Sequence, residues 1–103
     1  MIAFLLFLDP PRPDFAMTMT DEERAVMVAH VGYWSRLAQQ GSVIAFGPVA
    51  DPAGGYGVGI AVAEDVAGVE AMCDADPAMR SGRGFRTRIL PMPKLVTATA
   101  SYG

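Results

Sequence analysis

The chain has 103 residues, of which 51% are hydrophobic and 18% charged, and its formal net charge is -3. This length suffices for one hydrophobic core, so we expect a single domain over residues 1–103. An acidic chain lacks the basic stripe that binds phosphates, so we expect no nucleic acid and no anionic membrane as a partner. The lone Cys73 has no disulfide partner, and no apolar run reaches the roughly 20 residues of a membrane-spanning helix. We therefore expect a soluble, cytoplasmic protein.

The N-terminal segment predicts a buried strand followed by a loop. Ile2–Leu8 is a continuous apolar run without a helical period, as is typical of strands that are buried on both faces. Three prolines in the stretch 9–19 restrict its backbone and remove amide donors, so we expect a loop there. Loops of this length often border a site.

A long helix and a second strand are predicted next. Thr20 and Glu23 have the spacing of a capping box, in which two residues satisfy exposed helix amides reciprocally. The helix should span residues 21–40 and end at Gly41, because glycine easily takes the left-handed conformation after a last turn. Val43–Pro48 then predicts a strand. It should end at Gly47-Pro48, since proline cannot extend the ladder.

A hairpin and a second helix follow. The loop 51–55 has hairpin chemistry and leads into an alternating strand at Tyr56–Ala63. A helix over residues 66–74 should stop at Asp76-Pro77, because the proline ring disfavours helical geometry in the residue before it.

The last strand completes the order of elements. Phe85–Leu90 is predicted to end at Pro91, and residues 94–103 are a tail or a short edge strand. The resulting order βαββαβ interleaves two split βαβ units. It predicts an α+β fold, the ferredoxin-like plait, in which two helices cover one face of a four-stranded antiparallel sheet.

The first strand offers apolar side chains to both faces of this sheet. Two helices cover only one face, and large exposed apolar patches are unusual on monomers. A second copy of the sheet, packed face to face, would cover the other and make a homodimer of the dimeric α+β barrel type. The alternative is that loops and the tail cover this face.

His30 is the only histidine, and it falls in the middle of the apolar stripe of the helix 21–40. A structural core histidine is the alternative to a functional one. Antiparallel packing of the two helices would bring Asp76 beside it, and a carboxylate there leaves one ring nitrogen free to move a substrate proton. Asp76 is otherwise a turn residue, and Asp74 is a competing partner.

Further residues are candidates for contacts with a small-molecule ligand. Tyr33 and Trp34 would line an aromatic pocket or belong to the core. Gly47 lacks a side chain and allows close approach to the backbone, and Pro48 after it cannot extend the strand ladder. No phosphate-binding glycine loop, GxSxG motif or metal-ligand cluster is present in the sequence, so we expect no cofactor and no metal. Four arginines could meet a carboxylate substrate or form a solvated rim: Arg80, Arg83, Arg86 and Arg88.

Three motifs in this order resemble the YciI-related family. The stretch from His30 to Leu37 holds a histidine, Gly41–Val49 holds a Gly-Pro pair, and Asp74–Pro77 holds an Asp-Pro pair. The resemblance covers nearly the whole chain, and the ordered set is more specific than any one motif. Ala78 departs from the pattern, because an aromatic residue often follows Asp-Pro in this family.

This resemblance implies an acid–base dyad. The family is similar to other dimeric α+β barrels, and its dyad maps onto His30 and Asp76. We therefore expect a cofactor-free acid–base enzyme that performs an isomerisation or elimination on a small cyclic or aromatic acid. The alternative is a non-enzymatic domain that binds a small molecule, or haem through a histidine as in related barrels.

Overall fold

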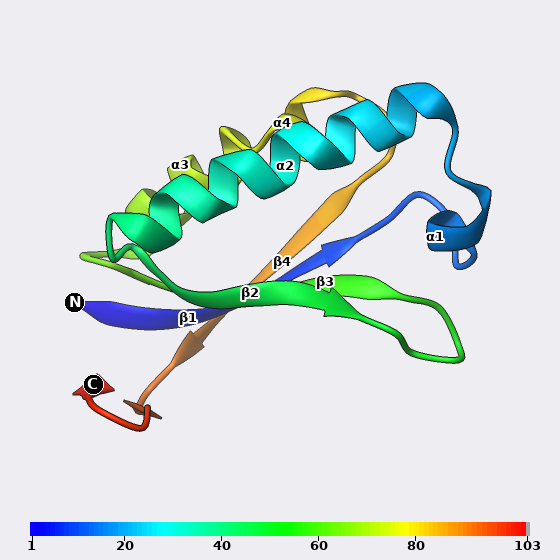
Figure 1. Cartoon of the computed structure of the whole chain (residues 1–103). Helices are drawn as coiled ribbons and strands as arrows, with labels where there is room; N and C mark the ends of the chain where they lie inside the picture. The colour runs from blue at the N-terminus through cyan, green and yellow to red at the C-terminus, as the bar shows by residue number, and fades with distance from the viewer. Residues whose placement is uncertain (103) are drawn as a thin grey trace.

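The computed structural model describes residues 1–102 and has a layer of helices on one face of a four-stranded antiparallel sheet (Figure 1). The strand order is β2-β3-β1-β4. The predicted α+β, ferredoxin-like plait is therefore confirmed. Over these residues no helix is both long and apolar enough to cross a membrane. The elements are β1 (Ile2–Asp9), α1 (Phe15–Thr18), α2 (Asp21–Gln39), β2 (Val43–Val49), β3 (Tyr56–Ala63), α3 (Val66–Asp74), α4 (Pro77–Arg80), β4 (Arg86–Met92), β5 (Leu95–Val96) and β6 (Ser101–Tyr102).

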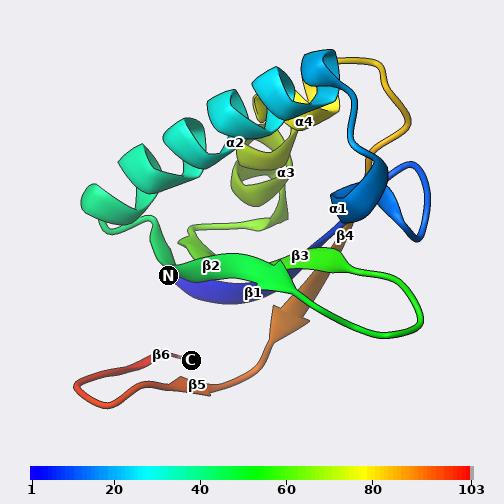
Figure 2. The same ribbon diagram turned by 45° about the vertical axis from the view of Figure 1, so that its right-hand side comes forward.

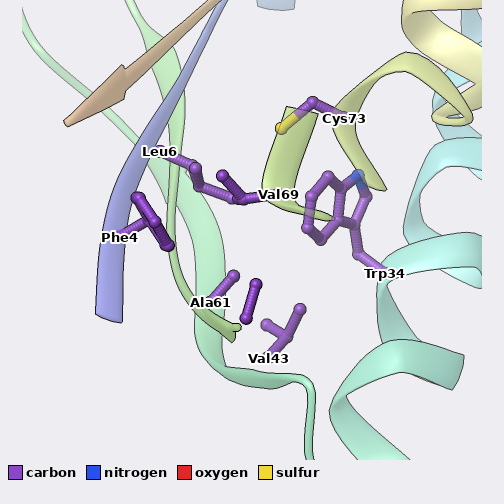
Figure 3. Close-up of a cluster of buried hydrophobic side chains, with 8 residues drawn as sticks. Phe4, Leu6, Trp34, Val43, Ala61, Val69 and Cys73 are labelled. Atoms are coloured by element: carbon purple, nitrogen blue, oxygen red, sulfur yellow. The ribbon is translucent and has the colours of Figure 1, made fainter. Parts of the chain in front are cut away.

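Side chains alternate across β1, and one set builds the core beneath the helices. Phe4 is fully buried opposite Ala61 of β3, and it packs in one cluster with Trp34 of α2 and Val69 of α3 (Figure 3). Burial of such large apolar side chains contributes about 1.5–3 kcal/mol each. This cluster fixes α2 and α3 on the sheet.

Toward the N-terminal end of β3, the positions that face the helices are glycines. Gly59 and Gly57 lie opposite Leu6 and Leu8 of β1. A Cβ atom at Gly59 would lie only 3.3 Å from the Cβ of Phe46. Because no side chain rises from β3 at these two positions, space remains between this end of the sheet and α2.

The face of the sheet away from the helices is partly covered by the C-terminal segment. β5 pairs with β6 in a separate antiparallel hairpin, which lies on this far face (Figure 2). Leu95 is buried there with Ala3 and Val62. β5 and β6 therefore pair with each other and not with a strand of the main sheet. Leu90, which pairs with Leu5 on the same face, remains 49% exposed.

Two strands run through prolines that the sequence predicts as strand ends. β2 continues past Pro48 to Val49, and β4 continues past Pro91 to Met92. Both are edge strands of the sheet. A residue without an N–H group is tolerated there because the outer side of an edge strand has no partner.

Two short helices occupy segments that the sequence predicts as a loop and as the end of a helix. α1 lies within residues 9–19, where Phe15 is buried against Phe85 with the ring planes at 82°. α4 begins directly at Pro77. A proline ends the preceding helix but suits the first position of a new one, where its missing N–H group would have no helical partner.

The start of α2 is tied to the loop before it. Thr20 and Glu23 form the predicted capping box, with hydrogen bonds of 3.1 Å and 2.9 Å. The guanidinium of Arg12 donates to both carboxylate oxygens of Glu23, at 2.7 Å and 2.9 Å, and to the carbonyl of Thr18 at 2.8 Å. One carboxylate therefore holds the loop and the helix together.

We predict that this contact makes the free energy of unfolding depend on pH in the acid range. The hydrogen bond from Arg12, and then that from the Thr20 amide, lowers the pKa of Glu23 from 4.5 to about 2. A carboxylate with a lowered pKa in the folded state stabilises the fold above its unfolded pKa, and this stabilisation is lost as the pH falls from 4.5 to about 2. In Glu23→Gln, denaturant unfolding should show a shallower loss of stability over this window than in the parent. The control is Glu22→Gln, at the exposed neighbouring position. If stability fell equally steeply with pH in the parent and in Glu23→Gln, the prediction would be contradicted.

Candidate functional site

The carboxylate of Asp76 lies at the start of α4 and is only 1% exposed. An aspartate before a proline is well suited to begin a helix, because its side chain accepts a hydrogen bond from an unpaired amide of the first turn. Here Oδ1 accepts from the N–H group of Ala78 at 2.9 Å. A buried carboxylate needs such partners, since desolvation of an unpaired charge is costly.

Trp34 supplies a second donor from α2. Its indole Nε1 donates to Oδ2 of Asp76 at 2.8 Å, and an indole N–H group can only donate. The ring is buried in the core cluster and makes an edge-to-face contact with Tyr33 at 5.5 Å between centroids. The packed core therefore fixes the orientation of the carboxylate.

His30 completes the group, one helical turn before Trp34. Its Nδ1 lies 2.9 Å from both carboxylate oxygens of Asp76. Because an ionised carboxylate only accepts, Nδ1 carries a proton and Nε2 holds the lone pair of the neutral ring. The structure thus brings together the two residues that the sequence predicts as a dyad, while Asp74, the competing partner, is exposed.

A cavity of about 260 Å³ lies between α2 and the helix-facing side of the sheet, and His30, Trp34 and Asp76 contribute to its wall. Other wall positions belong to the glycine end of β3 and to the 9–19 loop. In Figure 2, α1 and the β2–β3 loop lie at the same end of the molecule. The segment before α1 closely approaches the β2–β3 loop, because a Cβ atom at Gly54 would lie 3.1 Å from the Cβ of Pro13. Several large apolar side chains complete the wall: Leu6, Leu8, Phe15, Met19, Met27, Phe46 and Phe85.

Of the four residues predicted to contact a ligand, three lie in the cavity wall: Trp34, Gly47 and Pro48. Trp34 has its only polar atom occupied by Asp76. Tyr33 is placed elsewhere, because its hydroxyl donates to the carbonyl of Met72 at 2.6 Å and its ring packs on the core cluster. The prediction that Tyr33 lines the pocket therefore differs from the structure, since helical periodicity does not separate adjacent stripe positions that face the cavity from those that face α3.

The arginines near β4 do not meet the cavity. Among the described residues that line it there is no lysine or arginine. Arg88 instead pairs with Asp9 at 2.9 Å and lies 4.2 Å above the ring of Phe7. A carboxylate on the substrate would therefore meet no lysine or arginine among the described residues that line the cavity.

Sequence reasoning does not single out two neighbours of the pair. Cys73 lines the cavity from α3, and burial, together with Asp76 and Asp74, raises the pKa of its thiol to about 11. The thiol is therefore protonated at neutral pH and is a poor nucleophile. Ala78 is fully buried in a cluster with Leu8, Phe15 and Phe85, and an apolar pattern alone does not identify such partners. Within residues 1–102, no three His, Cys, Asp or Glu side chains are grouped to hold a metal ion.

The fold and the site together define a class, a ferredoxin-like α+β domain with a His–Asp pair on an apolar cavity. The family model described as YCII-related domain matches residues 3–93. The chain therefore belongs to the YCII-related family. Comparison with curated proteins finds no significant match.

We predict that removal of the buried carboxylate lowers stability. Asp76→Ala loses a helix cap and leaves the Trp34 and Ala78 N–H groups without their acceptor, so the free energy of unfolding should fall by about 2–4 kcal/mol. Asp74→Ala, two residues away and exposed, should change it by less than about 0.5 kcal/mol. Urea denaturation followed by circular dichroism measures both values, and equal effects of the two substitutions would contradict this account of Asp76.

Proposed function

We propose that the protein is a cofactor-free acid–base enzyme in which His30 transfers a proton of a small cyclic or aromatic substrate. The observation that carries the proposal is the contact of Nδ1 with the buried Asp76 carboxylate, at 2.9 Å from each oxygen. It leaves Nε2 as the free nitrogen of a ring that lines the cavity. The reaction class is an isomerisation or an elimination.

The proposed cycle uses His30 first as base and then as acid. Nε2 accepts a proton from the substrate, and the Asp76 carboxylate stabilises the imidazolium that forms. The proton then returns to another substrate atom in an isomerisation, or to a leaving group in an elimination. Trp34 acts as a positioning residue, because its indole N–H holds Asp76 rather than the substrate.

The proposal predicts that proton exchange depends on the pair. Small cyclic enones and lactones would be incubated with the protein in D₂O, and replacement of their acidic C–H atoms followed by NMR. His30→Ala should slow the catalysed exchange about 10²–10⁴-fold, the usual contribution of a positioned acid or base. Asp76→Asn should also slow it, because the amide does not stabilise the imidazolium as a carboxylate does.

The matched control is Tyr33→Phe, which changes an aromatic residue of the same helix whose hydroxyl bonds the Met72 carbonyl. Its exchange rate should stay within about threefold of the parent, because the lost hydroxyl bond lies outside the cavity wall and contributes only about 1 kcal/mol to folding. Full exchange in both His30→Ala and Asp76→Asn would reject the dyad. Ligand binding without exchange would favour a non-enzymatic binding domain.

The size of the cavity favours a ligand smaller than haem, the other ligand considered from the sequence. Pockets for drug-sized ligands measure about 300–1,000 Å³, and the haem macrocycle is a large ligand on that scale. The cavity beside His30 measures about 260 Å³ and is bounded by the 9–19 loop. No step of the proposed reaction uses haem.

We also propose that the protein acts as a homodimer formed through the far face of the sheet. Leu5 and Phe7 of β1 point away from the helices, as do Val58 and Ile60 of β3. The β5–β6 hairpin covers the end of this face near Ala3 and Val62, whereas Leu90 stays exposed. A second copy would bury this apolar remainder, as expected of an isologous interface.

The proposed dimer predicts the molar mass of the protein in solution. Light scattering should give twice the 10.9 kDa of one chain. Leu5→Glu should dissociate the dimer, because it places a charge at the centre of the far face. Val28→Glu is the control, since Val28 is an apolar residue of α2 that is 70% exposed, and its mass should equal that of the parent. A stable 10.9 kDa species for the parent would reject the proposal.

A further inference from the structure

The side chains that face the cavity include few polar groups and, within the described chain, none with a fixed positive charge. Three arginines adjoin lining residues in the sequence, and none of them lines the cavity. Arg12 binds Glu23, Arg88 binds Asp9, and Arg86 is exposed. An anionic ligand would therefore find His30 as its one possible cation, and only in the protonated state of the ring.

The backbone amides of β3, of β1 and of the start of α4 are also engaged. β3 and β1 are the two inner strands of the sheet, so the N–H groups of the glycine-rich wall bond to neighbouring strands. At the start of α4, the N–H group of Ala78 bonds to Asp76. A proposed second copy on the far face would be separated from the cavity by the sheet itself.

Charge counting then separates two classes of ligand. A carboxylate beside neutral His30 would place two anions, itself and Asp76, in an apolar cavity, which is strongly unfavourable. It avoids this only by taking up a proton from solvent onto His30, and a protonated ring is no longer a base. A neutral hydroxyl compound adds no charge and donates its hydroxyl to Nε2.

We propose that the substrate is a neutral, mostly apolar compound about one ring in size, with a phenolic or enolic hydroxyl directed at Nε2, rather than a carboxylic acid. This inference rests on the proposed role of His30 as base. In the transfer step, the O–H bond breaks and its electron pair stays on the oxygen, while the proton forms a bond to Nε2. The imidazolium then lies between two anions, the Asp76 carboxylate and the new oxyanion, and stabilises both.

The test compares 4-methylphenol with 4-methylbenzoate, two ligands that share a ring and differ in charge. Calorimetry should show that the phenol binds more than about tenfold tighter, which corresponds to about 1.4 kcal/mol. A phenol with a pKa near 10 carries no charge from about pH 6 to pH 8, so it should bind tighter than the benzoate at both ends of this range.

The other titratable side chains that line the cavity are Asp76, Cys73 and Tyr56. Cys73 does not titrate in this range, because burial raises its pKa to about 11. A positive control adds the missing cation with Val31→Arg, since Val31 lines the cavity and is 50% exposed. This variant should bind 4-methylbenzoate about tenfold tighter than the parent does.

Benzoate binding that equals or exceeds phenol binding across the pH range would overturn the inference, and so would the absence of binding for both ligands. These outcomes are distinct from failure of the proposed function, because the assay measures binding without turnover. Phenol preference without any proton exchange would keep the ligand class and reject the enzyme. Exchange of C–H atoms together with a preference for the benzoate would keep the enzyme and reject the ligand class.

Discussion

The structure of the site depends on one buried carboxylate and the three N–H groups around it. Asp76 accepts from the backbone of α4, from the indole of Trp34 and from the ring of His30. A charge so deeply buried is tolerated only where it is fully bonded, and the described chain has no buried side-chain N or O atom without a partner. The same contacts therefore begin a helix, join it to α2 and orient the imidazole.

The sheet beneath this carboxylate has two different ends. At one end, Phe4 and Ala61 pack tightly against α2 and α3. At the other, Gly57 and Gly59 place no side chains toward the helices. The structure thus combines a close-packed region that fixes Trp34 with an adjacent cavity whose wall includes His30 and Asp76. A functional site positioned by packed elements holds its geometry better than one that loops alone would form.

The sequence predicts much of this arrangement and misses parts of it for physical reasons. The capping box, the apolar run of β1 and the βαββαβ order are local or topological signals, and they lead to the fold and to the proximity of His30 and Asp76. The strands through Pro48 and Pro91 depend on edge positions that only tertiary structure defines. Helical periodicity also places Tyr33 in the apolar stripe without revealing that its hydroxyl meets the Met72 carbonyl.

The bond between Trp34 and Asp76 has an optical consequence. Trp34 is the single tryptophan of the chain, and its indole nitrogen donates to the carboxylate that holds the imidazole. Its ring also lines the cavity. The intrinsic fluorescence excited in this protein at the red edge of its absorption therefore originates from one indole at the site itself. Occupancy of the cavity and rearrangement of the pair can be followed through this native fluorophore without an attached label.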